Sequence, residues 1–334
     1  MPFSAQTSPA DSPSHLQSSR ACAHRLSRRT LLKGVGGLAA ASVIGGGAVV
    51  AGSAPAQAAL TVAEHEDHGR MQYYKLATSS IGWLPRVNVL LPDGYDTSRR
   101  YPVLFLLHGG GENYSTFDTK YDIRNHTAGR DLIVVMPDGG VAGWYCDPES
   151  SNVGPRNWET FHIKELLPWV DATFATTGQA SGRAVSGFSM GGFGALKYAA
   201  KYPELFASVS SHSGPADLRI QDGAVVHWAN FTAGATDLKG GTIYGIPWDQ
   251  ARVSADNPVE HVESYRGKRV FLVSGTESDR YESVVLPSQQ SFEKALDGAG
   301  IGYERYEDTG AHIVRWGRMQ QDIDSLLNHF AKGA

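Results

Sequence analysis

Cysteine is scarce in this sequence: only Cys22 and Cys146 occur among 334 residues. Cys22 lies in the N-terminal segment that we expect to be removed, so Cys146 has no partner left within the chain. An intrachain disulfide is therefore excluded even in a compartment that would permit one, and stability must come from a hydrophobic core. No nucleophile motif surrounds Cys146, which we expect to be a small buried hydrophobe.

Positive charge is also in short supply. The chain has 30 Lys and Arg against 34 Asp and Glu. Residues 1–58 contain five of the basic residues and one of the acidic ones, so the remainder carries 25 against 33, a net charge of −8. An acidic chain is a poor partner for nucleic acid or an anionic membrane surface, and we expect neither. The 276 residues left when 58 of the 334 are removed suit one α/β domain and are few for two.

A long uninterrupted apolar run is missing as well. Residues 34–59 are uncharged, but seven glycines among them dilute the apolarity that a membrane-spanning helix needs. They follow Arg28-Arg29, which forms a twin-arginine export pattern, and they contain small-residue cleavage sites at 54–58. We expect residues 1–58 to be a signal peptide that directs bacterial secretion of residues 59–334. An uncleaved membrane anchor is the alternative.

The most informative motif is a serine with a glycine two residues away on each side, Gly187-Phe188-Ser189-Met190-Gly191. Residues 183–186 suit a short strand, and residues 190–201 suit a helix. Glycines at these positions permit a sharp strand-to-helix turn that exposes the serine hydroxyl. The pattern predicts that Ser189 is a catalytic nucleophile, with an ordinary glycine-rich turn as the alternative.

A serine nucleophile needs donors for the developing oxyanion. The apolar run 101–107 is typical of a buried strand, and it leads into His108-Gly109-Gly110-Gly111. Glycines in such a loop let backbone N–H groups approach the oxyanion, so Gly110 and Met190 are the predicted donors. A phosphate-binding loop would instead require a following Gly-Lys-Ser/Thr, which the sequence lacks.

A base and an acid should follow the serine in chain order, each beyond a strand, because those strand ends meet at one edge of the sheet. The predicted strand 269–274 leads to Glu277 and Asp279, and residues 303–306 lead to His312. We assign His312 as general base and Asp279 as its orienting carboxylate. Glu277 competes with Asp279 for the acid role, and a surface position for His312 is the alternative.

Alternation of strands and helices predicts an α/β fold with a mostly parallel sheet covered on both faces. Further strands are expected at 86–91, 131–136 and 205–211, a helix around 163–174, and an amphipathic C-terminal helix at about 315–330. Residues 214–267 show no long periodic element but contain several aromatic residues. They are interpreted as a lid or pocket wall, with plain surface packing as the alternative.

Aromatic side chains near these motifs are candidates for substrate contacts: Trp144 and Tyr145 in a glycine-rich loop, and Trp228 in the 214–267 insert. Packing of the loop aromatics inside the protein is an equal alternative. Residues 65–68 could suggest a metal site, but they are expected to be mobile chain next to the cleavage site. We expect no metal and no cofactor.

The sequence resembles the esterase-D-like branch of the α/β-hydrolases, which includes S-formylglutathione hydrolases, feruloyl esterases and mycolyltransferases. The likeness runs from about residue 73 to 330 and is most specific at 106–114, 157–169 and 187–194. It implies the α/β-hydrolase fold, and it favours Asp279, three residues after a Gly-Thr pair, as the acid. Mycolyltransferases have Asp-Gly-Leu-Arg in place of residues 108–111, and their tryptophan two residues after the catalytic histidine is replaced by Val314.

Together these features predict a secreted serine carboxylesterase that hydrolyses a small-molecule, lipid or carbohydrate ester through an acyl-enzyme. An acyltransferase of the mycolyltransferase or diacylglycerol acyltransferase type would use the same acyl-enzyme and is the nearest alternative. A non-catalytic envelope- or carbohydrate-binding protein on the same fold is the second.

Overall fold

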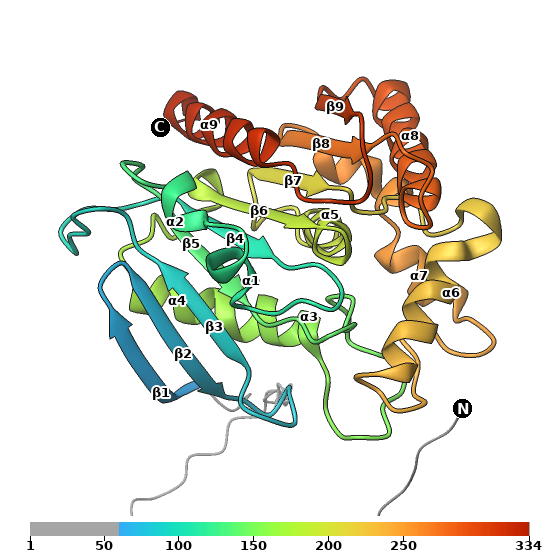
Figure 1. The fold of residues 1–334 in the computed structure, drawn as a ribbon, viewed down its shortest axis with the longest axis horizontal. Helices are drawn as coiled ribbons and strands as arrows, with labels where there is room; N and C mark the ends of the chain where they lie inside the picture. The colour runs from blue at the N-terminus through green and yellow to red at the C-terminus, as the bar shows by residue number, and fades with distance from the viewer. Residues whose placement is uncertain (1–59, 334) are drawn as a thin grey trace, which may run out of the picture. The chain divides into compact units, whose positions relative to one another are not determined.

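The computed structural model describes residues 60–333, so the predicted signal peptide 1–58 lies outside the described residues. These residues form a nine-stranded sheet flanked by helices (Figure 1). The strand order is β1-β2-β3-β5-β4-β6-β7-β8-β9. The strands are β1 Thr61–His68, β2 Met71–Ala77, β3 Arg86–Leu90, β4 Val103–Leu107, β5 Ile133–Pro137, β6 Arg183–Phe188, β7 Ser208–His212, β8 Arg269–Gly275 and β9 Glu304–Asp308.

The sheet is mostly parallel. The three pairs that join β1, β2, β3 and β5 are antiparallel, and the five pairs from β5 across to β9 are parallel. The central strands β4, β5 and β6 are buried at every residue, and the continuous apolar sequences of β4 and β5 are typical of a sheet covered on both faces. The predicted fold class is confirmed, and each predicted strand lies within about three residues of its expected place.

Helices cover both faces of the sheet (Figure 1). Side chains of α1, α2 and α9 join one core cluster, and side chains of α4, α5 and α8 join the other. The helices are α1 Thr116–Thr119, α2 Ile123–His126, α3 Trp158–Thr160, α4 Leu167–Thr173, α5 Met190–Lys201, α6 Ile220–Ala235, α7 Gln250–Asp256, α8 Glu282–Ala299 and α9 Trp316–Gly333, with a π-helical turn at Phe161–Leu166.

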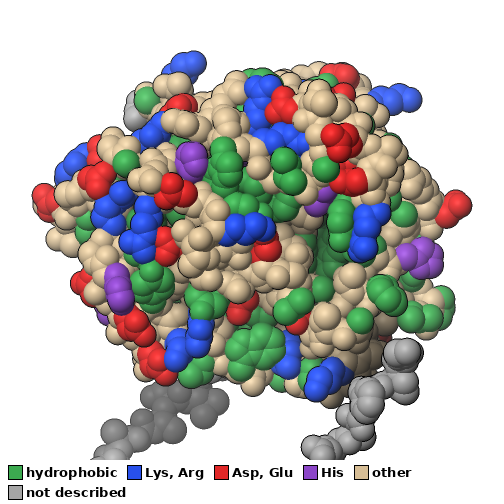
Figure 2. Space-filling view, in the orientation of Figure 1, with side chains coloured by type: hydrophobic (Ala, Val, Ile, Leu, Met, Phe, Trp, Pro, Cys, Tyr) green, Lys and Arg blue, Asp and Glu red, His purple; other side chains and the backbone are tan. Residues whose placement is uncertain are grey.

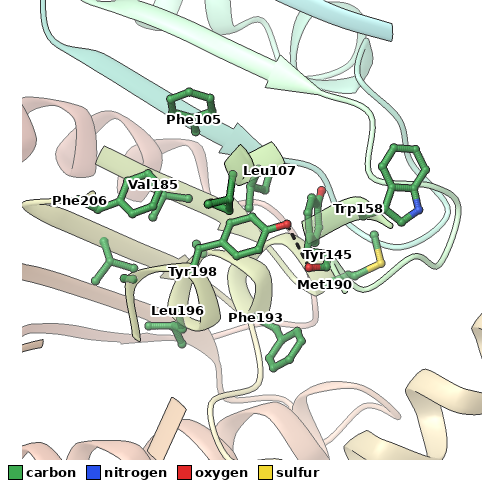
Figure 3. Close-up of a cluster of buried hydrophobic side chains, with 14 of the residues drawn as sticks. Phe105, Leu107, Tyr145, Trp158, Val185, Met190, Phe193, Leu196, Tyr198 and Phe206 are labelled. Atoms are coloured by element: carbon green, nitrogen blue, oxygen red, sulfur yellow. Dashed lines mark hydrogen bonds between the residues drawn. The ribbon is translucent and has the colours of Figure 1, made fainter. Parts of the chain in front are cut away.

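Helix α5 is the element that fixes the position of the Ser189 turn. Each of its residues from Met190 to Ala200 is buried. Figure 3 shows its side chains packed with those of the central strands, and the Tyr198 hydroxyl donates to the carbonyl of Tyr145 at 3.0 Å. Burial of this much apolar surface, at about 25 cal/mol per Å², holds the first turn of the helix rigidly against the end of β6.

The insert 214–267 contains a long helix, contrary to expectation. In α6 the buried residues are spaced as a helix requires, with Val225, Val226, Ala229 and Ala233 facing the core. The exposed Phe231 and the partly exposed Trp228 lie between them and hide this period in the sequence. At its start, residues 221–223 have left-handed backbone angles, which interrupt the regular helix.

Two more elements differ from expectation. Helix α8 was not predicted, because Ser288 and Gln289 occupy buried positions and break the apolar stripe. Residues 65–68 belong to the edge strand β1 rather than to mobile chain. All eight residues of β1 are exposed, so no hydrophobic alternation marks the strand in the sequence. Within residues 60–333, none of the helices combines the length and apolarity that crossing a bilayer requires.

Candidate active site

Ser189 occupies a strained turn between β6 and α5, with φ 56° and ψ −118°. Both flanking glycines are required for steric reasons. A Cβ on Gly187 would come 2.3 Å from the carbonyl oxygen of Gly191, and a Cβ on Gly191 would come 2.1 Å from that of Leu107. A strained backbone that the surrounding structure enforces is typical of a functional site. The predicted sharp strand-to-helix turn is therefore present, and the role of Ser189 as nucleophile stays a prediction.

His312 lies in the loop between β9 and α9, and its Nε2 is 2.8 Å from Ser189 Oγ. The imidazole packs against Phe188 and Tyr281, with ring centroids 5.0 Å away in each case. The structure thus brings together the two residues that sequence separates by more than a hundred positions. A surface position for His312 is excluded, since its side chain is only 8% exposed.

The carboxylate that contacts the imidazole belongs to Glu282, so the assignment of Asp279 to this position is wrong. Glu282 Oε1 lies 3.1 Å from His312 Nδ1, and the Glu282 side chain is fully buried. Its other oxygen has no hydrogen-bond partner among the described residues. A buried carboxylate on Nδ1 keeps the proton there and leaves Nε2 free to accept the serine proton.

Asp279 instead holds the loop together. Its Oδ2 accepts from the backbone N–H of His312 at 2.8 Å, and its Oδ1 accepts from those of Tyr281 and Glu282. Burial raises the pKa of Asp279, but these three N–H donors outweigh it and keep the pKa below its ordinary value. Asp279 contacts His312 through the backbone N–H of that histidine, and the contact with the imidazole is made by Glu282.

The sequence did contain a signal for Glu282. An Asp followed three residues later by Glu marks a helix start, and Glu282 is the first residue of α8. The structure places this side chain against His312, which lies in the loop between β9 and α9. Glu277, the other carboxylate considered, is exposed, and its backbone N–H donates to the carbonyl of Gly310.

The predicted oxyanion donors, Gly110 and Met190, both line the cavity that contains Ser189. Met190 is the first residue of α5, where a backbone N–H has no acceptor within the helix. In the glycine loop, Gly109 N–H donates to Glu112 and Gly111 N–H donates to Val141, whereas Gly110 N–H has no acceptor among the described residues. These two N–H groups are therefore available, and their role as an oxyanion hole remains a prediction.

A buried histidine fixes the glycine loop. His108 is 1% exposed, and its Nε2 accepts from Gly139 N–H at 2.9 Å. Its Nδ1 must then carry the proton, which it donates to the carbonyl of Gly109 at 2.8 Å. The His108 ring therefore links the glycine loop to the neighbouring 139–142 loop.

A cavity of about 630 Å³ opens above Ser189 and His312. Figure 2 shows a hollow with largely hydrophobic walls on this face of the molecule. Trp144 and Trp228, both predicted substrate contacts, line the cavity and pack edge to face at 5.2 Å. Helix α6 also supplies Phe231, Thr232 and Ala235, so the insert contributes a wall, as one of the two interpretations predicted.

Tyr145 does not contribute to the cavity, contrary to prediction. It is completely buried behind α5, where its hydroxyl donates to the carbonyl of His108 at 2.8 Å. Its ring occupies the space beside Gly194, where a Cβ would come 2.6 Å from it. Trp144 and Tyr145 both have positive φ, 51° and 56°, and only Trp144 lines the cavity.

The remaining candidates offer no other chemistry. Cys146 is buried, as expected, and burial raises the pKa of its thiol to about 12, so a reactive thiolate is excluded at neutral pH. Among residues 60–333, no group of three or more His, Cys, Asp or Glu side chains is arranged to hold a metal ion. The absence of a cofactor stays a prediction.

This chain is similar to known esterases and acyltransferases. Residues 78–319 match the family Esterase, described as "Putative esterase". "Esterase Rv1288" of Mycobacterium tuberculosis is 57% identical over 277 residues, which cover 80% of this chain and 60% of the relative, so this chain spans only about 60% of that protein. "Diacylglycerol acyltransferase/mycolyltransferase Ag85B" of Mycobacterium leprae is 29% identical over 219 residues, 60% of this chain and 66% of the relative.

Among solved structures, an S-formylglutathione hydrolase from Agrobacterium tumefaciens superposes with a TM-score of 0.64 at 19% identity. The match covers 82% of this chain and 99% of that one. At this identity the likeness shows the fold alone, which is the α/β-hydrolase fold.

Proposed function

Because this chain belongs to the Esterase family, we propose that it is a serine carboxylic-ester hydrolase that acts through an acyl-enzyme on Ser189. One observation carries the proposal. At the base of an open cavity, Ser189 Oγ lies 2.8 Å from Nε2 of His312, and Nδ1 of the same imidazole lies 3.1 Å from the Glu282 carboxylate. This order is the one that nucleophilic catalysis by serine requires.

In the proposed first step, Ser189 Oγ attacks the ester carbonyl carbon while His312 Nε2 takes the hydroxyl proton. Glu282 stabilises the imidazolium that forms, and the N–H groups of Gly110 and Met190 bind the oxyanion. His312 then returns the proton to the departing alkoxide, which leaves as the alcohol. Water repeats the sequence against the acyl-enzyme, releases the carboxylic acid and restores the Ser189 hydroxyl.

The walls of the cavity favour an apolar acyl group. Two basic side chains, Lys120 and Arg280, also line it. Most of the other lining residues are apolar and include the two tryptophans, Val141, Ala142, Phe188, Ile313 and Val314. Hydrophobic walls with a few polar groups at the reacting centre are typical of sites that bind the acyl part of an ester. Acyl transfer to an alcohol would use the same acyl-enzyme, and the name of the Ag85B relative makes it the second candidate.

One experiment separates hydrolysis from transfer and tests the nucleophile. The purified chain is given p-nitrophenyl esters of rising acyl length, with and without glycerol or glucose as acceptor, and the products are identified by mass spectrometry. We expect free acid as the main product and labelling of Ser189 alone by a fluorophosphonate. Acylated acceptor as the main product would favour transfer, and labelling at a different serine would overturn the assignment of the nucleophile.

We also propose export through the twin-arginine pathway, supported by Arg28-Arg29 and the uncharged segment after them. Replacement of both arginines by lysine should leave the protein in the cytoplasm. Mass spectrometry of the exported wild-type protein should show an N-terminus at Ala59 or Leu60. Undiminished secretion of the double variant would contradict this proposal.

A further inference from the structure

One carboxylate of the 214–267 insert, Asp237, reaches the loop next to the glycine loop. Asp237 follows the C-terminal end of α6, and its Oδ2 accepts from the backbone N–H of Ala142 at 2.7 Å. Burial raises the pKa of Asp237 above its ordinary value, and hydrogen bonds from the N–H groups of Ala142 and Val141 offset only part of that rise. Partial burial of a carboxylate costs solvation free energy, so its presence here calls for an explanation.

The loop 139–142 is shaped to receive this carboxylate. Gly140 has φ 74°, and a Cβ at this position would come 2.5 Å from Oδ2 of Asp237. Glycine therefore meets two needs at once, the left-handed backbone and the close approach of the carboxylate. At its other end the loop is held by His108, which accepts from the N–H of Gly139 at 2.9 Å.

One planar peptide group connects Asp237 to the glycine loop. The carbonyl of Val141 and the N–H of Ala142 belong to the same trans peptide, so they point in opposite directions. The N–H donates to Asp237, and the carbonyl accepts from the N–H of Gly111 at 2.8 Å. An anion on the N–H side polarises the peptide and strengthens its carbonyl as an acceptor. Asp237 therefore controls both the direction and the strength of the bond that holds Gly111.

Gly110, the predicted oxyanion donor, lies between two peptides that are held in this way. The carbonyl of Gly109 accepts from His108 Nδ1 at 2.8 Å, and because the 109–110 peptide is planar, the Gly110 N–H is directed away from that contact. The following peptide is held through the bond from Gly111 to Val141. Loss of either contact would free one side of Gly110.

Resting on the proposed function, we propose that Asp237 is a positioning residue for the oxyanion hole, which aims the Gly110 N–H through the 141–142 peptide. An oxyanion donor stabilises the transition state only if it is aimed at the place that the oxyanion will occupy. Loss of Asp237 should therefore lower kcat and leave KM unchanged. The insert then has a second role besides supplying a cavity wall.

The chain offers a matched control for the test. Asp249 lies in the same insert, and its carboxylate also accepts from backbone N–H groups, those of Ala251 and Arg252 at the start of α7. It is not among the residues that line the cavity around Ser189. Asp249→Asn should thus lower the thermal midpoint, as loss of a helix cap does, and leave kcat and KM at the wild-type values.

Steady-state kinetics on p-nitrophenyl acetate gives the first readout. Asp237→Ala should lower kcat about 100-fold, and Asp237→Asn about tenfold because its amide oxygen can still accept one N–H. The field of a negative charge near an oxyanion is unfavourable, so loss of the charge alone would raise kcat, and a fall identifies the geometric role. If Asp237→Ala does not fold, Asp237→Asn, which has nearly the same volume, gives the result. Unchanged or raised kcat in the folded variants would overturn the proposal.

A tetrahedral analogue separates positioning from a general loss of stability. Hexyl trifluoromethyl ketone should form an adduct on Ser189 that carries an oxyanion. Its affinity should fall in Asp237→Asn by the same factor as kcat/KM, and it should be unchanged in Asp249→Asn. Equal losses of affinity in the two variants would show a merely structural effect and overturn the proposal.

Hydrogen–deuterium exchange gives a readout that does not depend on ester hydrolysis. The amides of Gly111 and Ala142 should exchange about tenfold faster in Asp237→Asn than in the wild-type protein, and at the wild-type rate in Asp249→Asn. Unchanged exchange in Asp237→Asn would overturn the proposal even if the chain is an active esterase. A wild-type chain that hydrolyses no ester would contradict the proposed function, whereas faster exchange in Asp237→Asn would then still support the hold of Asp237 on the glycine loop.

Discussion

Two clusters of serine, histidine and carboxylate lie on the same sheet, and only one has the order that a nucleophile needs. At the end of β6, Ser189 contacts His312, which contacts Glu282. Beneath α9, Ser210 Oγ donates to Asp322 at 2.7 Å and His212 Nε2 lies 2.9 Å from the same carboxylate. In this second cluster the Ser210 hydroxyl and the His212 imidazole both contact the Asp322 carboxylate. The imidazole is therefore not available to accept the serine proton.

The two clusters also differ in their exposure to solvent and in the charges around them. Arg269 Nη2 lies 2.7 Å from Asp322 Oδ1, and the second cluster is buried throughout. Burial raises the pKa of Asp322, but Arg269, helped by His212 and Ser210, lowers it to about 2. The first cluster instead opens into a cavity of about 630 Å³. The same residue types thus make a candidate catalytic site in one place and a structural ion network in the other.

Replacement of the serine of each cluster by alanine should give the largest difference in kcat between the two clusters. Ser189→Ala is expected to lower kcat on p-nitrophenyl acetate by on the order of a millionfold, because the remaining residues cannot form the acyl-enzyme. Ser210→Ala should leave kcat per folded molecule unchanged and lower the free energy of unfolding by about 1–3 kcal/mol, since it removes a hydrogen bond to a buried charge. Urea unfolding measures the second effect. Equal losses of activity in both variants would contradict the distinction.

The carboxylates provide the next largest effect. Glu282→Gln should lower kcat by roughly 10⁴-fold, because the imidazolium loses its buried counter-charge and the ring can adopt the wrong tautomer. Asp279→Asn disturbs only the backbone contacts of the loop, so we expect a loss of at most about tenfold, or about 1.4 kcal/mol in the barrier. Steady-state kinetics on a short-chain ester compares them. A larger loss in Asp279→Asn would return the acid role to that residue.

Acid should weaken the second cluster in a defined pH range. The pKa of Asp322 is about 2 in the folded protein, below its ordinary 3.8. A lowered carboxyl pKa contributes stability that is present above the unfolded value and disappears as pH falls through the folded one. Between about pH 4 and pH 2, roughly 2 kcal/mol should therefore be lost through this group.

The variant Asp322→Asn isolates that contribution. It should cost about 3–5 kcal/mol of unfolding free energy at neutral pH, because Arg269 loses its buried carboxylate and keeps only the partly exposed Glu304 as an ionic partner. The difference between wild type and variant should shrink as pH falls from 4 to 2, and kcat per folded molecule at neutral pH should stay unchanged. A difference that is constant across this range would show that the charge of Asp322 is not responsible.

The local sequence pattern was sufficient to predict the turn that holds Ser189. Only glycine fits at positions 187 and 191, because a Cβ at either position would collide with backbone atoms. The glycine motif in the sequence therefore indicates the sharp turn at Ser189. The central strands β4 and β5 were predictable for a similar reason, because full burial makes them continuous apolar runs. His312 followed from chain order and its place after a strand.

Side-chain direction could not be derived in the same way. Asp279 and Glu282 are three residues apart, and the backbone of the loop decides which of them reaches the imidazole. The neighbours Trp144 and Tyr145 are equally aromatic, yet only Trp144 reaches the cavity. Asn88 occupies a strand between two valines, and nothing in that pattern indicates that its amide is unpaired. Each of these outcomes depends on contacts between segments distant in the sequence.

The smallest expected effect is on KM and concerns the rim of the cavity beside Ser189. The buried Asp322 cluster has no such cavity. Phe231 on α6 lines the cavity although 76% of it is exposed, so it contributes little to folding and can cover a bound acyl chain. Phe231→Ala should raise KM for an octanoyl ester roughly fivefold, equivalent to about 1 kcal/mol of lost apolar contact, and leave the acetyl ester unaffected. Ile246→Ala is a matched control, because Ile246 is 82% exposed in the same insert and lies outside the cavity lining. Neither variant should change the free energy of unfolding by more than about 0.5 kcal/mol. If both esters or both variants respond equally, the rim does not select the acyl chain, and selectivity must come from the buried walls around Trp144.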